Sequence, residues 1–135
     1  MQAADREASI KLMLAAKCHH GSSNLSFGMT NYAFSRNKSG SYVINLGMTY
    51  EKIKLAARMI HAVSEPRDVL AISAKPFGQR AVHKFSQFLG ALCINQRFTP
   101  GLFTNHSIKG KFVEPRLIII CDPNTDTQAI QEAAY

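Results

Sequence analysis

Five consecutive apolar residues, from Leu117 to Cys121 (LIIIC), constrain the fold of this chain more than any other segment. Successive side chains of a strand point to opposite faces, so a strand with one face in solvent alternates apolar and polar residues. This run shows no such alternation and predicts a strand that is covered on both faces. Strands of that kind occur mainly in parallel sheets with helices on both sides. We therefore expect an α/β fold.

The segments around this run alternate between strand and helix patterns. We expect strands at Val69 to Ser73 and Ala91 to Gln96, a helix at Gly78 to Leu89 between them, and a last helix at Thr125 to Tyr135. Strand, helix, strand connections make the sheet mainly parallel. The last helix is typical of a crossover that leads to another parallel strand. We therefore expect Leu117 to Cys121 to be interior and the sheet to be incomplete at the C-terminus.

The N-terminal half predicts two helices with a hairpin between them. Asp5 is a candidate N-cap for the first helix, and Thr49 is one for a second helix that ends near Ser64. Between them, strand-like runs at Tyr32 to Arg36 and Ser41 to Leu46 flank a four-residue turn. The helical periodicity places five apolar residues of the second helix on an inward face, namely Ile53, Ala56, Ala57, Ile60 and Val63.

No linker or internal repeat divides the 135 residues, so we expect a single domain that covers residues 1–135. The longest aliphatic run is far shorter than the ~20 residues of a membrane-spanning helix, and the first thirty residues lack a signal-peptide pattern. The expected location is therefore cytoplasmic. The three cysteines contain no Cys-x-x-Cys spacing, so we expect neither a disulfide framework nor a metal site.

Charge gives the first functional signal. The chain has 16 Lys and Arg against 9 Asp and Glu, a formal net charge of +7, and the acidic residues are clustered. None lies between Glu7 and Glu51, and none lies from Val69 to Val113. A carboxylate near a phosphate backbone is repelled, whereas each Lys or Arg that displaces a counterion adds affinity. The segregation therefore favours a nucleic acid partner over a basic surface kept for solubility.

Two segments concentrate the candidate contacts. The helix start at Gly78 to Arg80, flanked by Lys75 and Lys84, is typical of an anion site formed by free N–H groups. The irregular segment from Arg97 to Arg116 interleaves basic residues with phenylalanines, although phenylalanines in a loop more often anchor it to the core. The predicted nucleic-acid-binding residues are Arg36, Lys38, Lys75, Arg80, Lys84, Arg97, Lys109, Lys111 and Arg116.

Enzyme motifs are nearly absent. The chain lacks the glycine-rich dinucleotide and nucleoside triphosphate motifs, the nucleophile elbow and His-Glu-x-x-His. Asp122 follows a strand and leaves open a small phosphate-binding enzyme, but Asp122-Pro123 followed by Thr125-x-x-Gln128 is better interpreted as a turn and capping box. Cys18-His19-His20 is better interpreted as a helix end than as a metal site. We expect no catalytic residue, cofactor or small-molecule substrate.

Three ordered motifs carry a family resemblance. They are ISAKPFGQRAV at residues 72–82, RFTPGLFTN at residues 97–105 and EPRLIIICDP at residues 114–123. Together they resemble the ribosomal protein SA family, also called laminin receptor precursor, in its archaeal and eukaryotic branch. The similarity runs through nearly the whole chain.

The resemblance implies a flavodoxin-like three-layer fold without catalytic activity, truncated relative to a family that continues with further strands. It also implies a structural constituent of the small ribosomal subunit, needed for subunit assembly and translation. The implied partners are small-subunit rRNA and neighbouring ribosomal proteins, with no membrane. The family's second name leaves open an adhesion or scaffold protein outside the ribosome, which would need a membrane route that the sequence does not show.

Overall fold

The computed structural model describes residues 2–108 and 112–135. It divides into two compact units, Met1–Met59 and Ile60–Tyr135. The expectation of a single domain stays a prediction.

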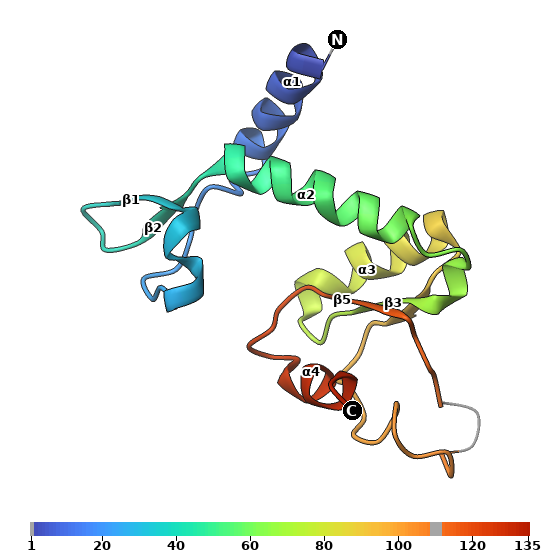
Figure 1. Ribbon diagram of the computed structural model, residues 1–135. Helices are drawn as coiled ribbons and strands as arrows, with labels where there is room; N and C mark the ends of the chain where they lie inside the picture. The colour runs from blue at the N-terminus through green and yellow to red at the C-terminus, as the bar shows by residue number, and fades with distance from the viewer. Residues whose placement is uncertain (1, 109–111) are drawn as a thin grey trace. The chain divides into compact units, whose positions relative to one another are not determined.

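The first unit contains the expected hairpin. Strands β1 (Ala33–Arg36) and β2 (Tyr42–Ile44) pair antiparallel, and a turn at residues 37–40 joins them. Figure 1 shows this turn at the end of the two strands. Gly40 has a φ of +87°, a left-handed conformation that glycine adopts without a steric penalty. The other elements of this unit are α1 (Gln2–Ala15), a 3-10 helix (Phe27–Tyr32) and α2 (Leu46–His61), which ends just beyond the unit boundary.

Both helices of this unit begin earlier than the sequence predicted. Helix α1 begins at Gln2, so Asp5 lies inside its first turn and is not the N-cap. Helix α2 begins at Leu46, directly after Asn45, whose side-chain oxygen accepts hydrogen bonds from the Gly47 and Met48 N–H groups at 3.0 and 3.4 Å. Asparagine is at least as good an N-cap as threonine, and it comes first in the chain. Thr49 is therefore not the cap.

The expected inward face of α2 is exposed over most of its length and half-buried only at its end. The side chain of Ile53 is 54% exposed, and Ala56 and Ala57 are also exposed. Only Ile60 and Val63, at the end of this segment, are half-buried. Periodicity predicted that α2 is amphipathic, but burial depends on the packing of other elements against that face.

The second unit confirms the α/β prediction. Its elements are β3 (Val69–Ile72), α3 (Pro76–Leu89), β4 (Leu92–Ile94), β5 (Leu117–Ile120) and α4 (Thr127–Ala133), with a 3-10 helix (Pro66–Asp68) before β3. The three strands form one sheet in the order β4-β3-β5. Both pairings are parallel, with Leu70 opposite Leu92 on one side and opposite Ile118 on the other.

The interior position expected for Leu117 to Cys121 in a completed sheet stays a prediction, and the open edge expected of an incomplete sheet is observed at β5. Among the described residues it pairs only with β3, and its residues are half-buried. The central strand is β3, all four residues of which are buried. An uninterrupted apolar run reports how well the two faces of a strand are covered, but it does not report how many neighbours the strand has.

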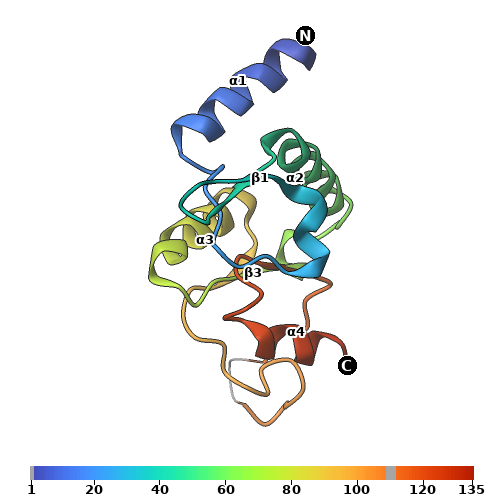
Figure 2. The same cartoon turned by 90° about the vertical axis from the view of Figure 1, so that its left-hand side faces the viewer.

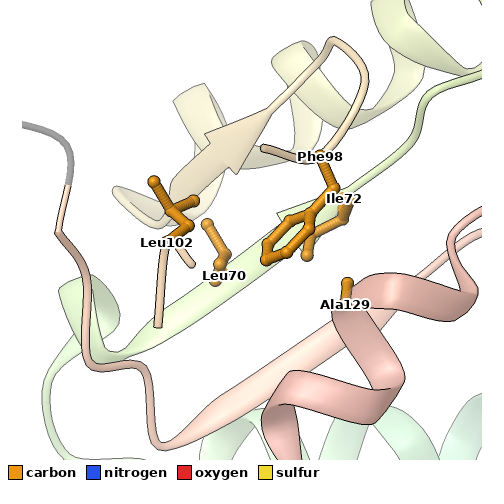
Figure 3. Close-up of a cluster of buried hydrophobic side chains, with 5 residues drawn as sticks. All are labelled: Leu70, Ile72, Phe98, Leu102 and Ala129. Atoms are coloured by element: carbon orange, nitrogen blue, oxygen red, sulfur yellow. The ribbon is translucent and has the colours of Figure 1, made fainter. Parts of the chain in front are cut away.

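Helices lie on both faces of this sheet. Figures 1 and 2 show α3 on one side of β3 and α4 on the other. On the α4 side, the buried core consists of side chains from β3, from the loop after β4 and from α4 (Figure 3), namely Leu70, Ile72, Phe98, Leu102 and Ala129. The expected three-layer arrangement is therefore present in this unit.

The start of α4 differs from the expected capping box. The N-cap is Asp126, so Thr125 lies outside the helix and donates its hydroxyl to Asp122 Oδ2 at 2.9 Å. Gln128 does not reach back to Thr125, because its side-chain amide donates to Glu132 Oε1 at 3.0 Å. The spacing was suitable for a capping box, but each side chain has a different partner in the fold.

Glu132 joins α4 to the irregular loop. Its carboxylate is buried and accepts the Gly101 N–H at 2.6 Å, where Gly101 has a φ of +86°. Burial by itself would raise the pKa of Glu132. The hydrogen bonds from the Gly101 backbone, the Gln128 side chain and the Phe103 backbone outweigh this effect and hold the pKa below its usual value. The carboxylate therefore stays charged and fixes the loop on α4.

Replacing this carboxylate tests its contribution to stability. We expect Glu132→Gln to lower the free energy of unfolding by about 1–3 kcal/mol, because a buried donor loses a charge-assisted acceptor. Denaturant unfolding measures the change. The matched control is Glu65→Gln, because Glu65 is exposed and its side chain forms no cap hydrogen bond. Equal stability of the two variants would contradict the assigned role of Glu132.

The same carboxylate predicts a pH dependence. The pKa of Glu132 is lower in the folded chain than its usual value of 4.5, so its contribution to stability is present above that value. The contribution is lost as the pH falls through the folded-state pKa, because protonation removes the charge that accepts the hydrogen bonds. We expect thermal melts below about pH 4.5 to decline less steeply for Glu132→Gln than for the wild-type chain. Parallel acid profiles would show that Glu132 is not linked to folding.

Candidate nucleic-acid interface

The predicted basic residues lie in both units. Arg36 and Lys38 lie in the first unit, and the second unit contains Lys75, Arg80, Lys84, Arg97 and Arg116. Lys109 and Lys111 lie outside the described residues. The structure therefore places one pair together at the hairpin, whereas the other five are distributed over the start and outer face of α3 and the two ends of the loop between β4 and β5.

The hairpin holds Arg36 and Lys38 at its tip. Arg36 Nε donates to the Gly40 carbonyl oxygen at 3.1 Å, and the guanidinium carbon lies 5.4 Å from the centre of the Tyr42 ring. Lys38 is exposed in the turn. A guanidinium that is held over a turn loses little rotamer freedom when it binds a phosphate. The tip therefore presents two adjacent cations, one of them pre-oriented.

The start of α3 is already neutralised by carboxylates of the chain itself. Lys75 occupies the N-cap position and forms an ion pair with Asp122. Asp126 Oδ2 accepts a hydrogen bond from the Ala74 N–H at 3.4 Å. A helix N-terminus favours negative charge, and here two aspartates supply it. The anion signal of the sequence is therefore satisfied internally to a large extent.

Asp122 connects the end of β5 to the start of α3 through polar contacts. In addition to the ion pair with Lys75, it accepts the Thr125 hydroxyl at 2.9 Å and the Asn124 N–H at 3.1 Å. The hydrogen bonds from Lys75 and Thr125 hold the pKa of Asp122 below its usual value. A carboxylate with such a low proton affinity is poorly matched to general acid or base catalysis near neutral pH.

Gly78 has a packing role. It lies where α3 passes close to the end of β3, and a Cβ at this position would overlap the Oγ atom of the buried Ser73. Its N–H is hydrogen-bonded to the Lys75 carbonyl at 3.0 Å. The glycine of the expected anion site is therefore required for the close approach of helix and strand.

Arg80 and Lys84 project from the outer face of α3. They are exposed and one helical turn apart, whereas Val82 and Ser86 form the buried side of the helix. Helix α3 contains no acidic residue. Two phenylalanines that sequence reasoning did not select, Phe77 and Phe88, are also exposed on this helix. Their spacing from Arg80 and Lys84 would have placed them on the same face.

Arg97 and Arg116 lie at the two ends of the irregular loop. Arg116 is anchored to Asp68, because its N–H donates to the Asp68 carbonyl at 2.8 Å and its Nε lies 3.6 Å from Oδ2. Arg97 lines an open pocket of about 310 Å³ after β4. The other residues that line this pocket are Cys93, Ile94, Asn95, Gln96, Thr99, Leu102 and Val113.

The phenylalanines of this loop serve the structure. Phe98 is buried in the core and packs against Phe103, with ring centres 5.0 Å apart. Phe112 packs against His106, with ring centres 4.0 Å apart. The interpretation that the phenylalanines anchor the loop is confirmed for Phe98 and Phe103, which pack in the core. Phe112 is half-buried and lies outside this core cluster, against the exposed His106.

Features of the rival functions are absent from the described part of the chain. Within residues 2–108 and 112–135, no three His, Cys, Asp or Glu side chains lie close enough to hold a metal ion. Over the same residues, no helix combines the length and apolar character that crossing a membrane requires.

Comparison with known proteins gives a consistent result. The model of the family "Ribosomal protein S2" matches residues 13–114. The chain is 47% identical over 135 residues to the small ribosomal subunit protein uS2 of Chlamydomonas reinhardtii, which covers 100% of this chain and 48% of that protein. It is 55% identical over 126 residues to the protein of the same name from Fusarium vanettenii, and this match covers 93% of this chain and 42% of that protein. It is 56% identical over 126 residues to the protein of the same name from Talaromyces marneffei, and this match covers 93% of this chain and 43% of that protein.

The chain thus spans less than half the length of these curated relatives. They are eukaryotic proteins, which agrees with the resemblance to the SA family that the three motifs carried. The family match covers most of the chain, including β3, β4, α3 and the loop before β5. This chain belongs to the ribosomal protein S2 family.

Proposed function

We propose that this chain is a structural constituent of the small ribosomal subunit, where it binds rRNA and neighbouring ribosomal proteins. The observation that carries the proposal is the family match over residues 13–114. The relatives named above are small ribosomal subunit proteins, and our proposal assigns the same role to this chain.

The distribution of charge supports an RNA partner. The net charge is +7, and the acidic residues are absent from Val69 to Val113, the range that contains α3. Where carboxylates do occur near this helix, they are engaged with the chain itself, as Asp122 is with Lys75. Arg80 and Lys84 lie on the outer face of α3 without an acidic residue in the helix. These two side chains are our leading candidates for phosphate contacts.

The geometry also ranks the remaining candidates. Lys75 and Arg116 form ion pairs with Asp122 and Asp68, so part of their charge is already compensated. Arg36 and Lys38 at the hairpin tip and Arg97 beside the pocket form a second group of proposed RNA-binding residues. Lys109 and Lys111 stay proposals from the sequence alone. The enzyme alternative is disfavoured, because Asp122 is engaged by Lys75 and Thr125 and the family is one of ribosomal proteins.

Co-sedimentation tests the proposal directly. We expect the tagged chain to sediment with small ribosomal subunits at low salt and to be released progressively as salt rises, because phosphate contacts exchange for counterions. A tagged protein of similar size and net charge from outside the family controls for non-specific adsorption. Recovery of the chain only in the free fraction at low salt would refute the proposed function.

Charge reversal tests the role of α3. We expect Arg80→Glu with Lys84→Glu to reduce RNA affinity across many sequences and to lower the salt slope of binding by about two, roughly one for each phosphate that is no longer neutralised. Filter binding over a salt series measures both quantities. The matched control is Lys52→Glu with Arg58→Glu, which changes two exposed cations on α2 by the same total charge. Equal reductions in both double variants would mean that only net charge matters.

A further inference from the structure

Helix α3 exposes two phenylalanines almost completely. The side chains of Phe77 and Phe88 are 83% and 88% exposed, although a phenylalanine gains more from burial than most residues. They lie eleven residues apart, which is close to three full turns of an α-helix, so they share one face. The same face carries Arg80, Ala81 and Lys84, at intervals of three or four residues. We call these five residues the α3 stripe.

The α3 stripe faces away from the sheet. Val82 and Ser86, which are buried, lie on the opposite side of the helix. The helix lies on one face of the sheet (Figures 1 and 2), and all five residues of the stripe are exposed. The stripe is therefore a surface with two aromatic ends and two cations between them.

The charge of the stripe indicates an anionic partner. Arg80 and Lys84 lie between the two rings, and no residue from Val69 to Val113 is acidic. Lys75, which Asp122 holds by an ion pair, lies with its Nζ atom 5.7 Å from the centre of the Phe77 ring. Lys75 therefore contacts the ring near the helix start, but its charge is partly compensated by Asp122, and the uncompensated cations of the stripe are Arg80 and Lys84.

The arrangement favours a nucleic acid strand over a protein surface. Protein interfaces are enriched in aromatic residues and arginine but depleted in lysine, so the exposed Lys84 in the middle of the stripe is the residue that argues against a protein partner. Proteins that bind single strands combine basic side chains along the backbone with aromatic side chains on which bases stack. The two rings are separated by about 16 Å along the helix axis, at 1.5 Å per residue, so they would take different bases of one strand.

We propose that the α3 stripe binds single-stranded rRNA, with Phe77 and Phe88 stacking on two unpaired bases while Arg80 and Lys84 contact the phosphates between them. This inference rests on the proposed function and adds to it the recognition of unpaired bases. Stacking accepts any base, because every base has a π-face. The stripe therefore selects single strands over duplexes without selecting a sequence.

Leucine substitution separates stacking from charge. In the full chain, we expect Phe77→Leu with Phe88→Leu to weaken binding of a short single-stranded poly(A) oligonucleotide about tenfold, with the salt slope unchanged. Binding of an RNA duplex should stay the same. Fluorescence anisotropy measures both affinities. The matched control is Phe27→Leu, because Phe27 is 97% exposed and lies in the other unit.

A tryptophan provides a spectroscopic signature of stacking. The chain has no tryptophan, so Phe88→Trp places a single fluorophore on the stripe. We expect the single-stranded oligonucleotide to quench its emission and the duplex to leave it nearly unchanged. Phe77→Tyr with Phe88→Tyr should keep wild-type affinity, because it keeps both aromatic faces. This variant distinguishes loss of stacking from loss of folding.

Unchanged affinity of the leucine variant for the single strand would overturn the proposal. Equal quenching by duplex and single strand would overturn it as well. If the leucine variant instead failed to bind a ribosomal protein neighbour while its RNA affinity stayed constant, the stripe would be a protein-docking surface, and the proposal would be wrong. In each of these cases, the wild-type chain would still sediment with small subunits if the proposed function holds.

Discussion

The complete burial of β3 is the constraint on which the structure of residues 60–135 depends. Both faces of this four-residue strand are covered, by α3 on one side and by α4 and the loop after β4 on the other. Because β3 pairs with both β4 and β5, it also sets the register of the sheet. Two polar contacts lie at the margin of this core. Glu132 and Asp122 provide them, by fixing the loop and the start of α3.

These polar contacts determine which basic side chains stay uncompensated and can contact a partner. The acidic residues near the carboxyl ends of the strands compensate the start of α3 and Lys75, so the anion site that the sequence favoured is largely filled by the chain itself. The cations that lack such a partner in the helix, Arg80 and Lys84, lie one to two turns further along α3. The candidate interface is therefore displaced from the helix start to the outer face of the helix. The exposed rings are likewise on α3, because Phe98 and Phe103 of the loop pack in the core whereas Phe77 and Phe88 are exposed.

Sequence reasoning predicted the elements better than their ends. The hairpin, the parallel strands and α3 were all expected from hydrophobic pattern and turn residues. The N-caps were not, because Asn45, Asp126 and the expected residues Thr49 and Thr125 are all chemically capable of capping. Which of several competent residues caps a helix depends on where the preceding strand or turn ends. The edge position of β5 was expected of a sheet that is incomplete at the C-terminus, and a second neighbour for this strand stays a prediction, since apolar composition reports covered faces and not paired edges.

The sequence by itself determined the fold class and the family, and it predicted an anionic partner. Strand and helix periods differ, the motifs are specific, and the segregation of acidic residues is visible without coordinates. Only the tertiary structure decided which cations and rings are exposed. Ion pairs such as Lys75 with Asp122 join residues 47 positions apart in the sequence, and no local pattern predicts them. Exposure of Phe77 and burial of Phe98 follow from long-range packing for the same reason.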